Sequence, residues 1–246
     1  MKNSFGVRHS DVNPVDPPYD RPFGLADLEF ARSTNPWLRS ISSHEIIQPT
    51  LHLGEAVRPF TLLRQPVARC ISHYQDKVVR GRRTLSFAEY LDDPANHNFQ
   101  VRKIAGAEDL ERARTLLRER YLFVGLAERF AESARILARL CPWPLDLRCR
   151  PVNVAADRRI SEQLLSDAAA IDRLREINRL DQQLWDYVAT DLLPAFTSRT
   201  GSVETGPLPT LPATTIPWRL YASRLYHKLA YRPLLKRERR RRTAHS

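Results

Sequence analysis

Apolar and polar residues follow two patterns in the middle of the chain. Short apolar runs fill 59–64 ("PFTLLR") and 121–126 ("YLFVGL"), and each precedes a segment with apolar residues every three or four positions, 66–79 and 127–140. The short runs predict buried strands, and the spaced residues predict helices. Pro66 suits a first helical turn, because that turn does not need the N–H that proline lacks. Strands that alternate with helices predict an α/β fold with a parallel central sheet flanked by helices.

Three further helices are expected from apolar residues at helical spacing, over 25–33, 105–120 and about 172–196. Residues 1–24 are rich in Pro, Asp and Asn and predict an irregular lead-in, without the apolar core of a signal peptide. Ser161 is expected to cap a helix.

Glycine and proline gather among Ser and Thr in residues 197–217, which is typical of a linker. The sequence therefore predicts an α/β domain over 1–196, a linker over 197–217 and a separate tail over 218–246. The tail is basic, and its leucines and tyrosines fit an amphipathic helix. A disordered, solubilising end fits the same composition, so both interpretations stay open.

The net charge of +11 is concentrated in the tail. Segment 219–246 holds ten Lys and Arg residues against Glu238 alone, so it carries +9 and leaves the rest of the chain nearly neutral. A globular part without excess charge is not expected to bind nucleic acid. The tail suits an anionic membrane surface or an acidic glycan, since each basic residue near a lipid surface contributes about 1 kcal/mol.

The cysteines Cys70, Cys141 and Cys149 have no metal-ligand spacing and are expected to be free thiols, which favours a reducing compartment. No window is apolar over the roughly 18 residues that a membrane-spanning helix needs. These features predict a cytoplasmic protein, with the tail as a means of peripheral contact with a membrane. No metal cluster is expected.

A candidate anion site lies where the first apolar run ends. A parallel strand delivers its last residue to the edge of the sheet where ligands bind in open α/β folds, and Arg64 stands at that position. The helix that begins near Pro66 would direct free N–H groups and its dipole to the same edge. Ser72 adds a hydroxyl, and the arginine fork matches the geometry of phosphate. A surface ion pair for Arg64, with no role for Ser72, fits the spacing equally well.

The segment "FTLLRQPVARCISHYQ" (60–75) closely resembles the 3′-phosphate-binding motif of carbohydrate O-sulfotransferases that use PAPS, 3′-phosphoadenylyl sulfate. That motif reads R-D-P-x-x-R-x-x-S-x-Y, and the chain departs from it only at Gln65. The nearest branch contains heparan sulfate and uronyl 2-O-sulfotransferases and many bacterial relatives. Segments 98–106, 121–140 and 178–185 ("N..D..LW") follow in the family's order. The resemblance implies the P-loop-nucleotide-kinase-like fold of sulfotransferases.

The resemblance implies that the chain moves a sulfuryl group from PAPS to a hydroxyl of a carbohydrate or glycoconjugate, leaving PAP as product. Arg64 and Ser72 would hold the 3′-phosphate of the cofactor. Arg69 belongs to the same motif, although a structural ion pair is the stronger interpretation of it. Tyr74 would either face the nucleotide or lie in the core. No metal is needed by this chemistry.

His44 is the candidate catalytic base, because the 2-O-sulfotransferase-like branch places a histidine about twenty residues before the arginine motif. His52 is the second choice, and His73 is expected to face elsewhere. Asn98 and Arg102 are candidates for contact with the acceptor or the cofactor, and a polar helix face is an equally good interpretation.

The family's loop for the 5′-phosphosulfate, of the kind P-K-[TA]-G-[ST]-[ST], is not found around any lysine of the chain. It is expected upstream of residue 1, so that an N-terminal strand and loop would be missing. The alternative is a catalytically inactive, sulfotransferase-like binding protein. The five lysines searched are Lys2, Lys77, Lys103, Lys228 and Lys236.

Overall fold

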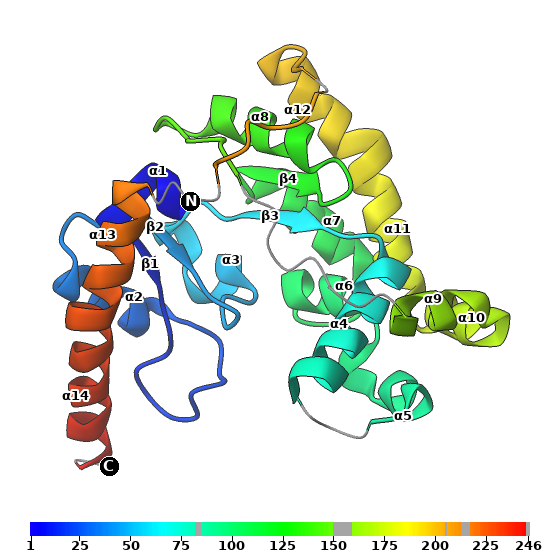
Figure 1. Ribbon diagram of the computed structural model, residues 1–246, viewed down its shortest axis with the longest axis horizontal. Helices are drawn as coiled ribbons and strands as arrows, with labels where there is room; N and C mark the ends of the chain where they lie inside the picture. The colour runs from blue at the N-terminus through cyan, green and yellow to red at the C-terminus, as the bar shows by residue number, and fades with distance from the viewer. Residues whose placement is uncertain (82–84, 150–158, 205, 213–216, 245–246) are drawn as a thin grey trace. The chain divides into compact units, whose positions relative to one another are not determined.

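The computed structural model describes residues 1–81, 85–149, 159–204, 206–212 and 217–244. They form two compact units, each assembled from separate stretches of the chain (Figure 1). The first unit comprises Met1–Pro59, Ala138–Arg150 and Pro207–Ser246, and the second comprises Phe60–Leu137 and Pro151–Gly206.

This division differs from the boundaries expected from composition. The tail is part of the first unit, together with the N-terminal residues, and the last helix of the second unit continues to Thr200, past the expected start of the linker. Positions 205 and 213–216 of the predicted linker, and 245–246 of the tail, lie outside the described residues.

The first unit is built around a β-α-β arrangement. Strand β1 (His9–Asp11) pairs in parallel with β2 (Ser40–Ser42), with His9 opposite Ser40, and helix α2 (Leu25–Thr34) connects them. The expected irregular lead-in is therefore wrong in part, because β1 is too short and too polar for an apolar pattern to reveal it. The other described elements of this unit are α1 (Lys2–Phe5), η1 (Gly6–Arg8), α3 (Pro49–His52), η2 (Gly54–Ala56), α13 (Trp218–Tyr226), η5 (His227–Tyr231) and α14 (Arg232–Thr243).

The tail forms one long helix, in which η5 is a π-helical segment between α13 and α14. Tyr231 and Leu235 are buried in the same core as Val12 and Leu28, so the interpretation of the tail as a disordered end is wrong. The Tyr231 hydroxyl accepts a hydrogen bond from the backbone N–H of Asn13 at 3.2 Å. The C-terminal helix and the N-terminal residues therefore contribute side chains to the same hydrophobic core.

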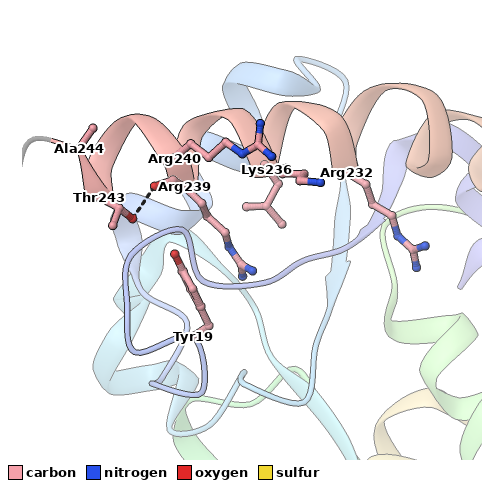
Figure 2. Close-up of a pocket in the computed structure, with 8 residues that line it drawn as sticks. Tyr19, Arg232, Lys236, Arg239, Arg240, Thr243 and Ala244 are labelled. Atoms are coloured by element: carbon pink, nitrogen blue, oxygen red, sulfur yellow. Dashed lines mark hydrogen bonds between the residues drawn. The ribbon is translucent and has the colours of Figure 1, made fainter.

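The loop between β1 and α2 also faces α14. The Arg239 guanidinium lies 3.9 Å from the centre of the Tyr19 ring (Figure 2), and its nitrogens donate to the Pro14 carbonyl at 2.6 and 3.2 Å. Arg242 donates to the Asp16 carboxylate at 2.8 and 3.1 Å. One side of α14 therefore packs against the loop between β1 and α2.

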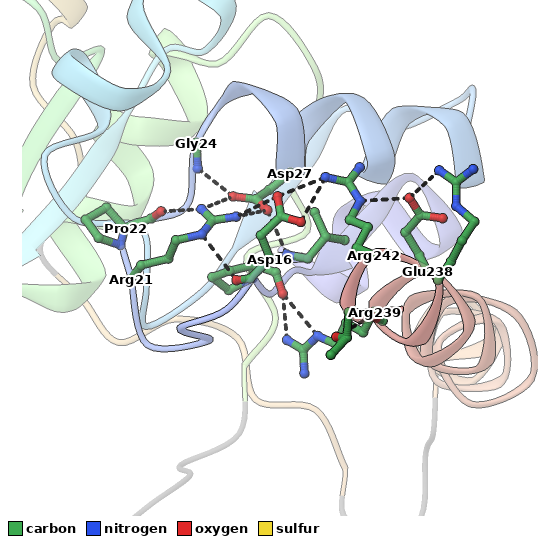
Figure 3. A network of polar contacts seen from close by, with 12 residues as sticks. Asp16, Arg21, Pro22, Gly24, Asp27, Glu238, Arg239 and Arg242 are labelled. Carbon is green, nitrogen blue, oxygen red and sulfur yellow. Dashed lines mark hydrogen bonds and ion pairs between the residues drawn. The ribbon is translucent and has the colours of Figure 1, made fainter. Parts of the chain in front are cut away.

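The fully buried carboxylate of Asp27 organises this loop (Figure 3). It accepts two hydrogen bonds from the Arg21 guanidinium at 2.7 Å and one each from the backbone N–H groups of Val15 and Gly24, at 2.7 and 2.8 Å. Burial alone would raise the pKa of Asp27, but the hydrogen bonds from Arg21, Gly24 and Val15 outweigh it and hold the pKa below its ordinary value. The ionised carboxylate is thus part of the folded first unit.

The second unit contains the two strands that the apolar runs predict. Strand β3 (Phe60–Leu63) pairs in parallel with β4 (Phe123–Leu126), with Phe60 opposite Phe123. The mixed α/β class with parallel pairing is confirmed, but the single central sheet is wrong for the part of the chain described. Its four strands form two separate two-stranded sheets, because each pair hydrogen-bonds only within its own unit.

Helices make up most of the second unit. In chain order they are α4 (Pro66–Gly81), α5 (Phe87–Asp92), η3 (Pro94–Asn96), α6 (Phe99–Ala105), α7 (Leu110–Glu119), α8 (Phe130–Leu140, which runs past the boundary at 137), α9 (Arg159–Ser166), α10 (Ala168–Ile177), α11 (Arg179–Tyr187), the π-helical η4 (Val188–Leu192) and α12 (Leu193–Thr200). Among these and the other helices described, none has the length and apolar character of a membrane span.

Two predicted helices are interrupted. The segment 105–120 begins as the end of α6, which Gly106 terminates with φ of 86°, and the segment 172–196 breaks at Asn178 between α10 and α11. Ser161 lies inside α9 and caps nothing, because its hydroxyl donates to the Gln75 side chain on α4. Strong local patterns predicted that helices exist, but not where they change direction.

The core of the second unit packs closely against β4. An added Cβ on Gly125 would lie 2.6 Å from the Ser133 side chain of α8, which requires glycine at this position. The Ser133 hydroxyl in turn accepts from the backbone N–H of Leu126 at 3.0 Å. Phe123 meets Phe196 of α12 edge-to-face, with ring centres 5.1 Å apart.

Substituting Asp27 by Asn should lower the free energy of unfolding of the first unit by about 3 kcal/mol at neutral pH, since Arg21 loses its carboxylate partner. The folded-state pKa of Asp27 is depressed. Its contribution is therefore present above the ordinary aspartate pKa of about 4 and is lost as the pH falls through the folded-state value. Urea unfolding followed by tryptophan fluorescence over a pH series measures both effects.

The matched control is Asp20→Asn, which removes the same charge from an exposed position of the same loop. It should change the free energy of unfolding by less than about 0.5 kcal/mol. Equal losses in the two variants would show that the Asp27 network does not stabilise the fold.

Candidate functional site

The carboxyl end of β3 presents Arg64, the first residue of the predicted anion site. The Gln100 side chain holds the backbone of Arg64 at both polar groups: its Oε1 accepts from the Arg64 N–H and its Nε2 donates to the Arg64 carbonyl, each at 2.9 Å. The strand end is therefore fixed from α6. The Arg64 side chain is exposed and makes no hydrogen bond or ion pair with the described residues.

The start of α4 differs from the expectation that free N–H groups would face the site. The N–H of Gln65 donates to the Glu128 carboxylate, and the Gln65 Oε1 accepts from the N–H of Ala68, both at 2.8 Å. Glu128 also accepts from the Trp185 indole at 3.2 Å. Because a carboxylate of the protein already lies at this helix terminus, the terminus contributes less to an external anion than the sequence predicted.

Ser72 lies on α4, about 9 Å along the helix axis from Pro66 at the usual rise per residue. Its side chain is half-buried, and its hydroxyl has no hydrogen-bond partner in the described part of the chain. Arg64 and Ser72 are thus the two polar groups of the motif whose side chains the described fold leaves uncommitted.

Arg69 is used by the fold. Its Nη2 donates to the Asn96 carbonyl at 3.2 Å and to the Cys70 sulfur at 3.0 Å, and its guanidinium lies 4.8 Å from the centre of the Phe99 ring. The structural role expected for Arg69 is therefore present, with a carbonyl and a ring in place of the expected ion pair. Contact of Arg69 with a cofactor stays a prediction.

Tyr74 is a core residue. Its ring packs edge-to-face on Phe87 and Tyr90, with centres 4.9 and 5.4 Å apart, and its hydroxyl donates to the Leu85 carbonyl at 2.8 Å. Burial raises the pKa of Tyr74. Of the two interpretations of this residue, the structure supports the core.

Asn98 and Asp181 cap each other's helices. The Asn98 Oδ1 accepts from the backbone N–H groups of Leu180 and Asp181 at the start of α11, at 3.0 and 3.4 Å. The Asp181 carboxylate accepts from the backbone N–H groups of Gln100 and Val101 at the start of α6, at 3.0 and 2.8 Å. Burial raises the pKa of Asp181, against the hydrogen bonds from these two N–H groups and the nearby Arg69 charge.

Asn98 also borders a small polar cavity of about 340 Å³. The Asn98 Nδ2 donates to the Glu108 carboxylate at 3.2 Å, and the other residues that line the cavity include Arg173, Glu176 and Arg179. Arg102 donates to the Pro94 carbonyl at 2.5 Å on the exposed side of α6. Asn98 therefore has a structural role at the border of this cavity.

His44 lies two residues after the end of β2, is exposed and belongs to the first unit, whereas Arg64, Ser72, Arg69, Tyr74, Asn98 and Arg102 belong to the second. His52 ends α3 in the first unit. His73 is half-buried and in contact with Tyr90: its Nδ1 lies 3.0 Å from the Tyr90 hydroxyl, and burial lowers its pKa.

The first unit contains a buried histidine that no pattern in the sequence indicates. His9 is 2% exposed, its Nδ1 lies 3.1 Å from the Ser40 hydroxyl, and its Nε2 lies 3.4 Å from the Asp11 carboxylate. Burial lowers the pKa of His9, while hydrogen bonds from His9, Lys2 and Ser42 hold the pKa of Asp11 well below its usual range. Only the pairing of β1 with β2 brings these residues together.

Comparison with known proteins identifies no relative: no family model matches the chain, and no curated protein or solved structure shows significant similarity to it. Any functional conclusion therefore depends on the residues and their geometry.

Replacing Gln100 by Ala should lower the free energy of unfolding by about 2 kcal/mol, since it leaves the N–H and carbonyl of Arg64 without partners. Amide hydrogen exchange at Arg64, measured by NMR, should accelerate together with this loss. Gln163→Ala, the same substitution at an exposed position of α9, is the control and should alter neither quantity. Unchanged exchange at Arg64 in Gln100→Ala would contradict the anchoring role.

Proposed function

We propose that this chain is a sulfotransferase that moves a sulfuryl group from PAPS to a hydroxyl of a carbohydrate or glycoconjugate, on the sulfotransferase fold that the motif resemblance implies. The proposal rests on one observation, the absence of hydrogen-bond partners in the described residues for the side chains of Arg64 and Ser72. Both side chains lie on the β3–α4 segment that resembles the 3′-phosphate motif, and neither has a partner in the described residues.

The residues present fit the 3′-phosphate of the cofactor. The anchored end of β3 holds the backbone of Arg64 while its guanidinium reaches solvent, where the planar fork can donate two parallel hydrogen bonds to phosphate oxygens. The Ser72 hydroxyl adds a neutral donor. When bound, the cofactor supplies the activated sulfuryl group. The chain's own task at this end is to bind and orient the nucleotide.

A base must also take the proton of the acceptor hydroxyl. His44 is the candidate, because its side chain is exposed and histidine is the residue that most often serves as a general base. Asn98 and Arg102 are the candidates for acceptor contact, with Asn98 at the border of the polar cavity.

A non-catalytic, cofactor-binding role is the second candidate. The lysines of the chain that the structure describes serve other contacts or lie on helices: Lys2 pairs with Asp11, and Lys77 lies 5.5 Å from the centre of the Tyr90 ring. None of the five follows a strand in a glycine-rich turn of the kind that grips the 5′-phosphosulfate. Binding of PAP without any transfer by the wild type would favour this candidate.

Calorimetric titration should show that the chain binds PAP more tightly than ADP, because only PAP carries the 3′-phosphate. Arg64→Ala should weaken PAP binding by about 10- to 100-fold and remove this preference. Arg112→Ala, at an exposed position of α7, is the matched control and should leave PAP affinity unchanged. Equal affinities for PAP and ADP in the wild type would overturn the proposal.

His44→Ala should keep the affinity for PAP and reduce transfer of labelled sulfate from PAPS to desulfated glycosaminoglycan chains by about 10²- to 10⁴-fold. His52→Ala serves as the comparison and should retain transfer. If transfer by His44→Ala equals that of the wild type, His44 is not the base.

A further inference from the structure

The long C-terminal helix has an outer face that combines apolar and basic side chains. Five large apolar residues on it are between 40% and 73% exposed: Trp218, Tyr221, Leu225, Leu229 and Leu234. Exposed cations are interspersed with them at Arg224, Lys228, Arg232, Lys236, Arg237 and Arg240. These eleven residues form the outer face of the helix.

The opposite side of the same helix is committed to the first unit. Tyr231 and Leu235 are core residues, Arg239 donates to the Pro14 carbonyl, and Arg242 pairs with Asp16 (Figure 3). The outer face therefore cannot be buried by a rotation of the helix, and its exposure is fixed by the packing of the other side.

The cations of the outer face are not neutralised by the part of the chain that the structure describes. None of the six makes a hydrogen bond or ion pair with the residues that the structure describes. Glu238, the one acid of the helix, is paired with Arg241 and Arg242 instead. A concentrated positive charge without internal partners requires an anionic counterpart or solvent.

A cavity of about 670 Å³ opens beside these cations (Figure 2). Arg232, Lys236 and Arg240 lie along it on α14, and Tyr19 faces it from the loop after β1. Its apolar part includes Leu235. The lining thus combines cations with apolar surface, which suits a ligand that is anionic at one end and apolar at the other.

We propose that the outer face binds the surface of an anionic phospholipid bilayer. Trp218, Tyr221 and the leucines enter the boundary between headgroups and acyl chains, where amphipathic rings and aliphatic side chains are stable. The six cations contact lipid phosphates, and the cavity accepts a headgroup. An acidic polysaccharide or a nucleic acid would neutralise the cations equally well but would leave the apolar side chains in water.

Co-sedimentation with vesicles tests this proposal on the full chain. Binding is expected to vesicles of phosphatidylcholine mixed with phosphatidylserine, and only weakly to phosphatidylcholine alone. Arg232→Gln with Lys236→Gln should reduce the partition coefficient by about 30-fold, since each basic residue contributes about fivefold at an anionic surface. The matched control, Arg112→Gln with Arg179→Gln, removes the same charge from exposed positions of the second unit and should have no such effect.

A second variant separates lipid from other polyanions. Trp218→Ser with Leu229→Ser keeps every charge, and should weaken vesicle binding by about tenfold or more for each side chain. Quenching of Trp218 fluorescence by brominated lipid should be seen in the wild type and be absent in Trp218→Phe. Heparin or DNA binding that exceeds vesicle binding and is unaffected by Trp218→Ser with Leu229→Ser would overturn the proposal, as would equal binding to the two kinds of vesicle.

Discussion

The geometry of the candidate site depends on one side-chain amide. Gln100 pairs with both backbone polar groups of Arg64, and its own backbone N–H is held by Asp181, whose N–H is held in turn by Asn98. These bonds join the end of β3 to the starts of α6 and α11 in a partly or fully buried setting, where an unpaired polar group is costly. The direction in which Arg64 leaves the sheet follows from this chain of bonds.

The local part of this arrangement could be predicted from sequence. The apolar runs before Arg64 and before Ala127 are continuous, and the helices that follow have clear spacing, so β3, α4, β4 and α8 were expected near their observed positions. The hydrogen bonds that fix the end of β3 were not expected. Asn98 and Asp181 are 83 residues apart, and each residue type is a common helix cap, so the sequence gives no sign that they interact. The use of the α4 terminus by Glu128 was hidden for the same reason.

The tail shows what amphipathic spacing can and cannot reveal. Its leucines and tyrosines indicated a helix, but not which of them face inward. Tyr226 and Tyr231 pack on the core of the first unit, while Tyr221, Leu225 and Leu229 point outward. The π-helical turn at His227–Tyr231 shifts the helix face at this point, and no residue pattern announces it. The residues proposed to bind the nucleotide phosphate lie in the second unit and the face proposed to contact lipid lies in the first, so a test of one proposal is independent of a test of the other.

The assembly of the first unit from distant stretches has a consequence for biosynthesis. Val12, Phe23 and Leu28 leave the ribosome early, but they share a core with Tyr231 and Leu235, which are translated after the entire second unit. The nascent chain therefore carries unsatisfied apolar surface while the second unit is translated, the situation in which chaperones bind. The second unit, whose segments are contiguous from Phe60 to Gly206 apart from Ala138–Arg150, can fold before this core closes.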